Sequence, residues 1–569
     1  MTILPSKTTR RPTCATQRLT SKDIERAREI QASEGRLEQF ALEIGLEDEE
    51  SALKALGREF AMGWVDVTEV EVDAELLAEF PVRLIHRHSV FPVSRRGRLL
   101  RLAMGNPFDL QAVDAVSAIT GWTVDPVLAL PDELARLAKT HLGVGAETID
   151  GLLAQDEENS DIEFLEQSEW DNSEASEAAQ EASVVRLVNE ILSEAVEARA
   201  SDIHLESQAK GLKIRYRIDG VLQTQPVPPE LNRFQAAIIS RLKIMSKMNI
   251  AEKRVPQDGR IKLKVSGREI DIRVSIIPML HNESIVMRVL DKDAMSFDLQ
   301  GIGMEPDTYD AFHEIIRMPH GILLVTGPTG SGKTTTLYSA LAEIRSEKTK
   351  IITTEDPIEY QLDGINQIQV HHKVGLTFAA SLRSILRHDP DVVLVGEIRD
   401  FETAENAIQA ALTGHMVFST LHTNDAAGAF MRLGDMGVEP FLTSTTVEGV
   451  LAQRLVRTLC HECREAYHPL HEDLPADFAF DKHDSVQPLY RARGCRVCRG
   501  TGYSGRLGIY ELLTTGDEVR RLAGEGQTSL EIKKAAIANG MRTLRDDGWL
   551  KVLRGQTSID EVLRVTKAD

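Results

Sequence analysis

The segment GPTGSGKT at residues 327–334 follows the apolar run ILLV at 322–325 and leads into TTLYSALAEI at 335–344. A buried strand, a glycine-rich loop and a helix are therefore expected in that order. In such a loop the glycines let backbone N–H groups turn towards an anion, and the helix N-terminus adds the positive end of its dipole. The segment predicts a phosphate-binding loop and an α/β fold whose sheet binds its ligand at the carboxyl edge.

The loop residues have expected roles in binding ATP and Mg²⁺. Lys333 would reach the β- and γ-phosphates, and the Thr334 hydroxyl would ligate Mg²⁺. A flexible glycine loop without a ligand is the competing interpretation, and the strand before the loop and the helix after it argue against that interpretation. The expected nucleotide-binding residues are Gly327, Pro328, Thr329, Gly330, Ser331, Gly332, Lys333 and Thr334.

Length and composition bound the class of protein. With 569 residues the chain is too long for one core and suggests about three or four domains. No uninterrupted apolar segment approaches the roughly 18 residues of a membrane span, and the polar start MTILPSKTTRRPT lacks the apolar region of a secretory signal. We therefore expect a cytoplasmic protein. The net charge of −21 argues against wholesale binding of nucleic acid.

Pattern and composition divide the chain into four parts. Residues 1–150 mix amphipathic helical stretches with the strand-like RLLRLAM, which predicts an α+β domain. Acidic and small residues dominate 151–182 and predict a solvated linker, with a specific acidic docking tail as the less favoured alternative. In 183–298 a helix leads into alternating strands, which predicts a second α/β domain. In 299–569 strands alternate with helices, the pattern of a parallel sheet, before a helical tail closes the chain.

Carboxylates end two of the predicted strands in this last part. KIITTEDPIEY at 350–360 places Glu355 and Glu359 after an apolar run, and ATP hydrolysis needs an acceptor near the attacking water. DVVLVGEIRD at 391–400 ends in Glu397. Because a glycine stands where many P-loop enzymes carry a Mg²⁺-bound aspartate, Glu397 is expected to act on the metal or its waters.

Histidines flank a third strand. MVFST at 416–420 lies between His415 and His422, and these imidazoles are candidates to contact the γ-phosphate. Taken alone, each histidine would more often be structural. Three polar strand ends on one sheet with a phosphate-binding loop favour a functional role.

Two cysteine pairs predict a metal site. Cys460-x-x-Cys463 and Cys495-x-x-Cys498 together supply the four thiolates that Zn²⁺ takes in structural sites, with no position open for water. The alternative, redox chemistry at a CxxC pair, is disfavoured because neither pair begins a helix after a strand. A zinc subdomain is therefore expected within 456–512.

Together these motifs resemble the secretion ATPases of the type II and type IV pilus systems. The resemblance covers roughly residue 184 to the end and rests on GPTGSGKT, TTEDPIEY, LRSILRHDPDVVLVGEIRD and TGHMVFSTLHTND. The strings ASDIHLE, RYRIDG, MGVEPFL and VLAQRLVRTLC, in this order, are most similar to the type II branch. The paired cysteines resemble those of type II ATPases and of many pilus assembly relatives, whereas retraction ATPases generally lack them. The resemblance implies an α/β fold with N-terminal α/β domains, a RecA-like ATPase core with a zinc-binding insertion, and a homo-hexameric ring.

The resemblance also implies residue roles. Glu359 would be the catalytic glutamate, Glu397 the Walker B glutamate, and His415 with His422 the His-box pair. Arginines of the second domain would approach the nucleotide of their own or a neighbouring subunit, with simple solubilising charge as the alternative for each. The matching arginines are Arg215, Arg217, Arg260 and Arg273.

The implied function is a cytoplasmic Mg²⁺-dependent ATPase that drives pseudopilus assembly and protein export. The N-terminal domain would dock it on inner-membrane platform proteins. The runner-up is a type IV pilus assembly ATPase. A nucleic-acid motor with a RecA-like core is disfavoured by the acidic balance and the absence of aromatic-basic runs. An inactive ATP-binding scaffold is disfavoured by the presence of Lys333, Glu359 and Glu397.

Overall fold

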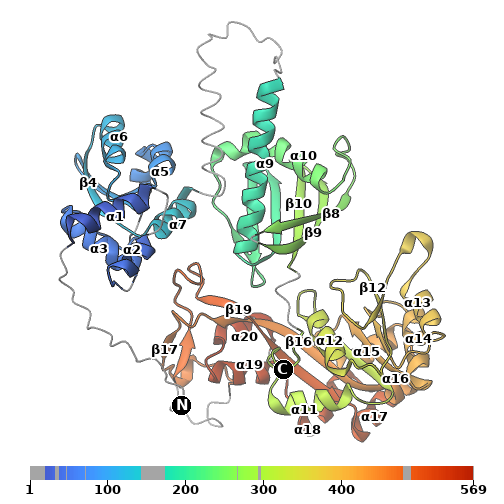
Figure 1. Cartoon of the computed structure of the whole chain (residues 1–569). Coiled ribbons are helices and arrows are strands. Elements are labelled where there is room, and N and C mark those ends of the chain that lie inside the picture. The colour runs from blue at the N-terminus through green and yellow to red at the C-terminus, as the bar shows by residue number, and fades with distance from the viewer. Residues whose placement is uncertain are drawn as a thin grey trace, which may run out of the picture. The chain divides into compact units, whose positions relative to one another are not determined.

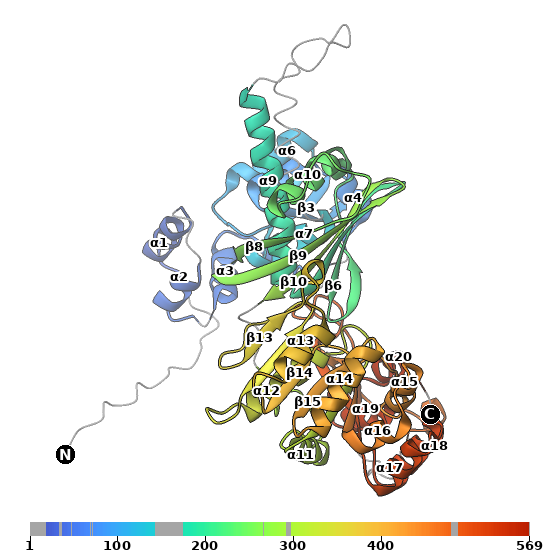
Figure 2. The same ribbon diagram turned by 90° about the vertical axis from the view of Figure 1, so that its right-hand side faces the viewer.

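A computed structural model describes residues 19–32, 37–46, 48–68, 70, 72–142, 174–265, 267–291, 297–478 and 488–567. The chain forms two compact units, Met1–Ser266 with Asp271–Val289, and Gly267–Ile270 with Leu290–Asp569. Figures 1 and 2 show the ribbon in two orientations. Over the described ranges, no helix combines the length and the apolar character needed to cross a lipid bilayer.

The N-terminal part of the first unit is built on a four-stranded sheet with the order β1-β4-β3-β2. Its strands are β1 (Gly63–Trp64), β2 (Val90–Arg96), β3 (Leu99–Met104) and β4 (Thr123–Leu128). Its helices are α1 (Ser21–Ala32), α2 (Leu37–Glu43), α3 (Glu49–Glu59), α4 (Ala74–Glu79), α5 (Val82–His88), α6 (Leu110–Thr120) and α7 (Pro131–Leu142). The strand-like RLLRLAM predicted β3, but the sequence did not predict the parallel pairing of β4 with β1 and β3.

Local capping explains where helices of this part begin and end. Asp48 precedes α3 and its carboxylate accepts a hydrogen bond from the Ser51 N–H, while Asp109 does the same for Ala112 at the start of α6. Gly121 ends α6 in the left-handed conformation with φ of +68°. Each cap satisfies a backbone group that the helix leaves unpaired.

The second part of this unit is a six-stranded sheet with the order β7-β6-β5-β10-β9-β8. Its strands are β5 (Ala200–Gln208), β6 (Gly211–Ile218), β7 (Val221–Thr224), β8 (Gln257–Val265), β9 (Arg268–Met279) and β10 (Asn282–Asp291). Helices α9 (Glu174–Glu197) and α10 (Gln235–Met245) pack against each other and against the sheet (Figure 1). The Tyr216 hydroxyl on β6 donates to the Ile191 carbonyl of α9 at 2.9 Å, which fixes the helix on the sheet.

Part of the expected acidic linker is helical. Residues 174–182 form the first turns of α9, because alanine and glutamate are strong helix formers that continue the helix predicted from Val184. The rest of the expected linker, apart from these turns, lies outside the described residues.

The second unit contains a seven-stranded sheet with the order β13-β12-β14-β15-β11-β16-β19. Neighbouring strands run parallel from β13 to β16, and β19 is antiparallel to β16. The strands are β11 (Gly321–Thr326), β12 (Ile351–Glu355), β13 (Asn366–Gln369), β14 (Val392–Val395), β15 (Met416–Leu421), β16 (Val447–Leu459) and β19 (Tyr503–Thr514). The predicted parallel sheet is confirmed, so the carboxyl ends of its strands meet at one edge.

Helices cover both faces of this sheet. Alternate residues of β11 face opposite sides: Ile322 and Leu324 pack in the core under α13, α14 and α15, whereas Leu323 and Val325 pack in the core under α11 and α12. These helices are α11 (Pro306–Ile315), α12 (Lys333–Ile344), α13 (Phe378–Ile385), α14 (Phe401–Leu412) and α15 (Gly428–Asp435). Burial on both faces explains why the four residues ILLV of β11 are all apolar.

The C-terminal part of this unit adds further helices and a small antiparallel strand pair. The strands are β17 (Glu465–Tyr467) and β18 (Leu489–Arg491). The helices are α16 (Pro440–Thr446), α17 (Asp517–Gly524), α18 (Ser529–Ala538), α19 (Leu544–Leu553) and α20 (Ile559–Val565). The predicted helical tail from Asp517 is therefore confirmed.

Candidate nucleotide and metal sites

The predicted phosphate-binding loop joins β11 to α12 and is shaped by glycine. Gly327 and Gly332 have φ of +146° and +91°, in the region that disfavours side chains. A Cβ on Gly327 would lie 2.6 Å from the Gln453 carbonyl oxygen, and a Cβ on Gly332 would lie 2.7 Å from the Gln453 side-chain nitrogen. Only glycine fits at either position, so the loop has the backbone shape and the open helix N-terminus that a phosphate requires.

Lys333 is folded onto this loop. Its Nζ donates hydrogen bonds to the carbonyls of Gly327 at 2.7 Å and Pro328 at 3.1 Å. Burial and, to a smaller extent, Arg454 lower the pKa of Lys333 to about 8, against the opposite effect of Glu397. The ammonium has lost water and lies at the mouth of an anion site, where a phosphate oxygen would be a strong partner.

Glu397 and His422 meet at the carboxyl edge of the sheet. They follow β14 and β15, which are neighbouring parallel strands. Glu397 Oε2 lies 3.5 Å from His422 Nε2, and Glu397 Oε1 contacts the Arg399 guanidinium. The charge of Glu397 also acts to raise the pKa of Lys333. The Glu397 carboxylate, the His422 imidazole and the Lys333 ammonium therefore lie at the same edge of the sheet.

The carboxylates after β12 differ in their surroundings. Glu355 is buried and accepts hydrogen bonds from Thr353 Oγ1 at 2.5 Å, from Gln367 Nε2 at 3.2 Å and from the Tyr338 hydroxyl. Burial raises the pKa of Tyr338, and so does Glu355, while the backbone N–H of Glu359 binds the phenol and acts in the opposite direction. Glu355 is thus structural, and Tyr338 of α12 helps to position the loop that carries the half-buried Glu359.

His415 lies at the opposite edge of the sheet. The next residue, Met416, pairs with Gly321 at the start of β11, whereas Leu421 pairs with the last residue of β11, next to the phosphate-binding loop. His415 Nδ1 lies 2.9 Å from the Ala410 carbonyl at the end of α14. A strand separates the two histidines by about 20 Å, at roughly 3.3 Å per residue. The expectation that both contact the phosphate is therefore corrected for this chain: His422 lies at that edge and His415 does not.

The arginines expected near the nucleotide lie in the first unit. Arg260 on β8 donates from Nε to Asp271 on β9 at 2.5 Å, and this bond raises the pKa of Arg260. Arg273 lies two residues further along β9. Arg215 and Arg217 pair with carboxylates of the neighbouring strand β5. An arginine from this set would have to exchange a carboxylate for a phosphate.

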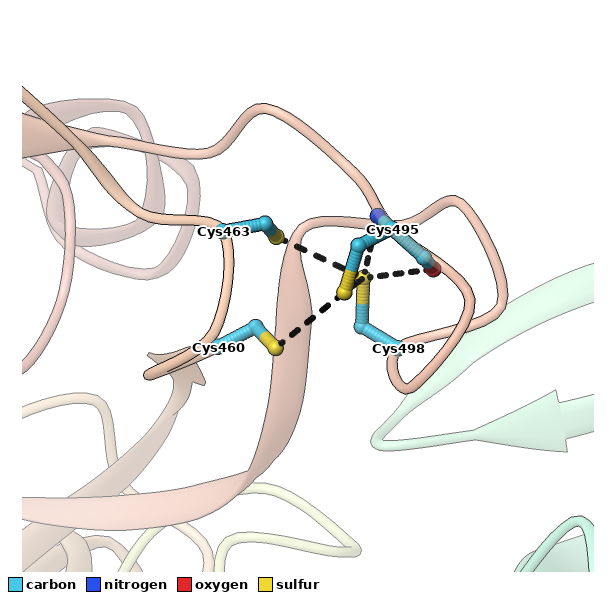
Figure 3. A group of neighbouring side chains, drawn as sticks. All are labelled: Cys460, Cys463, Cys495 and Cys498. Carbon is cyan, nitrogen blue, oxygen red and sulfur yellow. Dashed lines mark hydrogen bonds between the residues drawn. The ribbon is translucent and has the colours of Figure 1, made fainter. Parts of the chain in front are cut away.

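The four cysteines come together as two facing loops (Figure 3). Their sulfur atoms all lie within 4.8 Å of one another. The Sγ–Sγ distances are 3.8 Å for Cys460–Cys495, 3.7 Å for Cys463–Cys498 and 3.7 Å for Cys495–Cys498. A tetrahedron with Zn–S bonds of roughly 2.3 Å has edges of about 3.8 Å, so the four donors fit a tetrahedral metal ion.

The surroundings of Cys498 stabilise the thiolate form of its side chain. The backbone N–H groups of Cys495 and Gly502 both donate to Cys498 Sγ at 3.1 Å. Burial raises the pKa of Cys498, but these hydrogen bonds outweigh it and the pKa is about 7. Donors aimed at a sulfur stabilise the thiolate that binds a metal.

Sequence reasoning missed two residues beside the phosphate-binding loop. Gln453 and Arg454 lie on β16, and Gln453 closes the space over the loop glycines. A signal was present, since this polar pair interrupts the apolar strand VLAQRLV at 450–456. A polar pair in a buried strand needs partners, and here they are Thr336 of α12 for Gln453 and Asn424 for Arg454.

A glycine loop between a buried strand and a helix, with a carboxylate and an imidazole on the adjacent parallel strands, defines a P-loop ATPase with a RecA-like core. The chain belongs to the Type II/IV secretion system protein family, whose model matches residues 177–564. A second model, the MshEN domain, matches residues 56–147 in the N-terminal part.

Named relatives match most of the chain. The type II secretion system protein E of Xanthomonas campestris pv. campestris is 44% identical and covers 97% of both chains. The type II secretion system ATPase E of Vibrio cholerae is 51% identical over 70% of this chain and 78% of its own. The type IV pilus assembly ATPase PilB of Myxococcus xanthus is 40% identical over 96% of this chain and 97% of its own.

Proposed function

We propose that this chain is the hexameric ATPase that powers pseudopilus assembly and protein export in a type II secretion system. The observation that carries the proposal is the similarity to a type II secretion protein E along 97% of both chains, at 44% identity. Assembly of a type IV pilus is the second candidate, favoured by 40% identity to the pilus ATPase over a similar span. The type II relatives reach 51% and 52% identity over their matched parts, which favours secretion.

The proposed hydrolysis uses residues at the carboxyl edge of the sheet. The loop of residues 327–332 would hold the phosphates, and Lys333 would leave its two carbonyl partners to neutralise the charge of the β- and γ-phosphates. The exposed Thr334 hydroxyl would bind Mg²⁺, which supplies further charge neutralisation when present. Glu359 would accept the proton of the attacking water, while Glu397 and His422 would orient the groups around the γ-phosphate.

The proposed assembly is a homo-hexameric ring. Arg260 or Arg273 of the first unit would approach the nucleotide of its own or a neighbouring chain and stabilise the transferring phosphoryl group, as a guanidinium supplied on closure does in other P-loop enzymes. The N-terminal part would bind inner-membrane platform proteins, so the ring would work in the cytoplasm at the inner face of that membrane. No nucleic-acid partner is expected, in line with the net charge of −21.

Gene deletion tests the function. In the bacterium that encodes this chain, loss of the gene is expected to leave exported proteins in the periplasm and to leave pili intact, and the wild-type gene should restore export. The culture medium and the periplasm are assayed for the exported proteins, and pili are counted on the same cells. Loss of pili with normal export would assign the chain to pilus assembly. Pseudopilin and secretin genes beside this gene would support secretion.

We also propose that the four cysteines hold one structural Zn²⁺ per chain. Purified protein should contain close to one equivalent of zinc, because four thiolates at tetrahedral spacing leave no position for water.

Cys463→Ser should lower the zinc content and the melting temperature, since binding of the metal contributes to folding. Metal analysis and thermal unfolding measure both effects. Cys14→Ser is the matched control, because Cys14 lies outside the two CxxC pairs in the sequence, and it should change neither the zinc content nor the melting temperature. Protein prepared without chelator that is folded, holds no zinc and has free thiols would refute the zinc assignment.

A further inference from the structure

The guanidinium of Arg454 joins the elements that surround the phosphate-binding loop. Its Nη1 donates to the Gln453 carbonyl at 3.0 Å, and its Nη2 donates to the Asn424 carbonyl at 2.8 Å. The same Nη1 would lie 3.1 Å from a Cβ built on Gly327. The planar fork therefore binds the loop after β15 and lies beside the first glycine of the phosphate-binding loop.

The strand that presents Arg454 is fixed in place. The Thr336 hydroxyl of α12 donates to Gln453 Oε1 at 2.7 Å, and both residues are buried. β16 also pairs with β11 on one side and with β19 on the other. Because Arg454 pairs with Ile509 of β19 directly after these contacts, it has a defined position relative to the phosphate-binding loop.

The loop that Arg454 holds is the loop that begins with His422. Asn424, whose carbonyl accepts from Arg454, lies two residues after His422. Further along the same loop, the Ala426 N–H donates to Glu511 Oε1 at 2.8 Å. Glu511 lies on β19 and is buried, so one end of the loop is fixed to the sheet core. Arg454 holds the loop at Asn424, between the end of β15 and this anchor at Ala426.

We propose that Arg454 is a positioning residue for ATP hydrolysis: its guanidinium holds the loop that carries His422 in register with the phosphate-binding loop. The proposal rests on the proposed hydrolysis at this loop and extends it to a residue outside the sequence motifs. Arginine suits this role because its rigid fork can bridge two carbonyls, whereas the single ammonium of lysine has no fixed geometry. Its charge also lies on the side of the phosphates.

The test compares full-length variants in ATP hydrolysis with Mg²⁺. Arg454→Gln removes the charge and the fork, and Arg454→Lys keeps the charge alone. Arg520→Gln is the matched control, because Arg520 also bridges two carbonyls, those of Ser444 and Thr445, but away from the loop. We expect Arg454→Gln to lower kcat on the order of 100-fold, the cost of a displacement of about 1 Å at a reacting centre, with a smaller change in KM. Arg454→Lys should recover only part of kcat, and Arg520→Gln should keep the parent value.

The pH profile separates this role from a general loss of structure. Glu397 and Arg454 are the charged groups that act on Lys333, and Arg454 lowers the pKa of Lys333. The pH profile of kcat/KM reports the pKa values of the essential groups in the free enzyme. Its alkaline limb should move to higher pH in Arg454→Gln, where Lys333 keeps its proton longer, and should stay in place in Arg454→Lys and in Arg520→Gln.

Two results would overturn the inference. One is parent kcat and an unshifted alkaline limb in Arg454→Gln. The other is an equal loss of kcat in Arg520→Gln with no shift in any variant, which would mean that only the fold was affected. If Arg454→Gln does not fold, the partial recovery in Arg454→Lys decides the question. A Lys333→Ala protein that still hydrolyses ATP would instead refute the proposed function, so the two failures are distinguishable.

Discussion

Lys333→Ala is expected to reduce ATP hydrolysis on the order of a thousandfold, because the variant loses the ammonium that would offset the charge of the transferring phosphoryl group. Phosphate release by purified full-length protein measures the effect. Lys348→Ala is the matched control: Lys348 is exposed in the loop after α12, and its removal should leave the rate unchanged. Hydrolysis at the parent rate in Lys333→Ala would place the catalytic site elsewhere in the chain.

The same inactive chain tests the ring. If each active site needs an arginine from a neighbouring chain, closure is coupled between subunits. Adding Lys333→Ala protein to wild-type protein at fixed total concentration, with time for exchange, should then depress activity more than the mole fraction predicts. Activity per chain should also rise steeply with protein concentration. A strictly linear fall, with specific activity independent of concentration, would show that each chain works alone.

Glu359→Gln is expected to bind nucleotide and to lose turnover on the order of a thousandfold, because an amide cannot accept the proton of the attacking water. Nucleotide binding and phosphate release are measured on the same preparation, and Glu347→Gln, at an exposed position, serves as the control. The parent rate in Glu359→Gln would show that another group accepts the proton. Glu397, which already lies within 3.5 Å of His422, would then become the leading candidate.

The sequence predicted the parts of the molecule that follow from local pattern. An apolar run, a glycine loop and a helical period predict a strand, a turn shaped by glycine and a helix, and the structure has all three in that order. The cysteine spacing predicted a cluster because two short CxxC loops need only approach each other once, and the sulfur atoms do meet. These predictions depend on residues that are close in sequence, as in β11, the loop and α12, or that are of one type, as are the four cysteines.

What the sequence left open depends on register and on distant pairing. His415 and His422 look equivalent in the string TGHMVFSTLH, but a strand between them sends them to opposite edges. Glu355 and Glu359 look like one acidic cluster in the sequence. In the structure, however, Glu355 accepts a hydrogen bond from the Tyr338 hydroxyl of α12. Arg454 reaches the loop through a sheet neighbour more than a hundred residues away, a contact that no local pattern encodes.

Strand β16 has a mechanical consequence. Arg454 stands beside the phosphate-binding loop, and Cys460 directly follows the end of the same strand. The six residue steps from Arg454 to Cys460 span about 20 Å at roughly 3.3 Å per residue. Along this stretch β16 is hydrogen-bonded to β19, whereas its pairing with β11 ends at Ala452. A displacement of β16 beside the phosphate-binding loop would therefore be passed to the first cysteine pair along a single strand that is paired with β19.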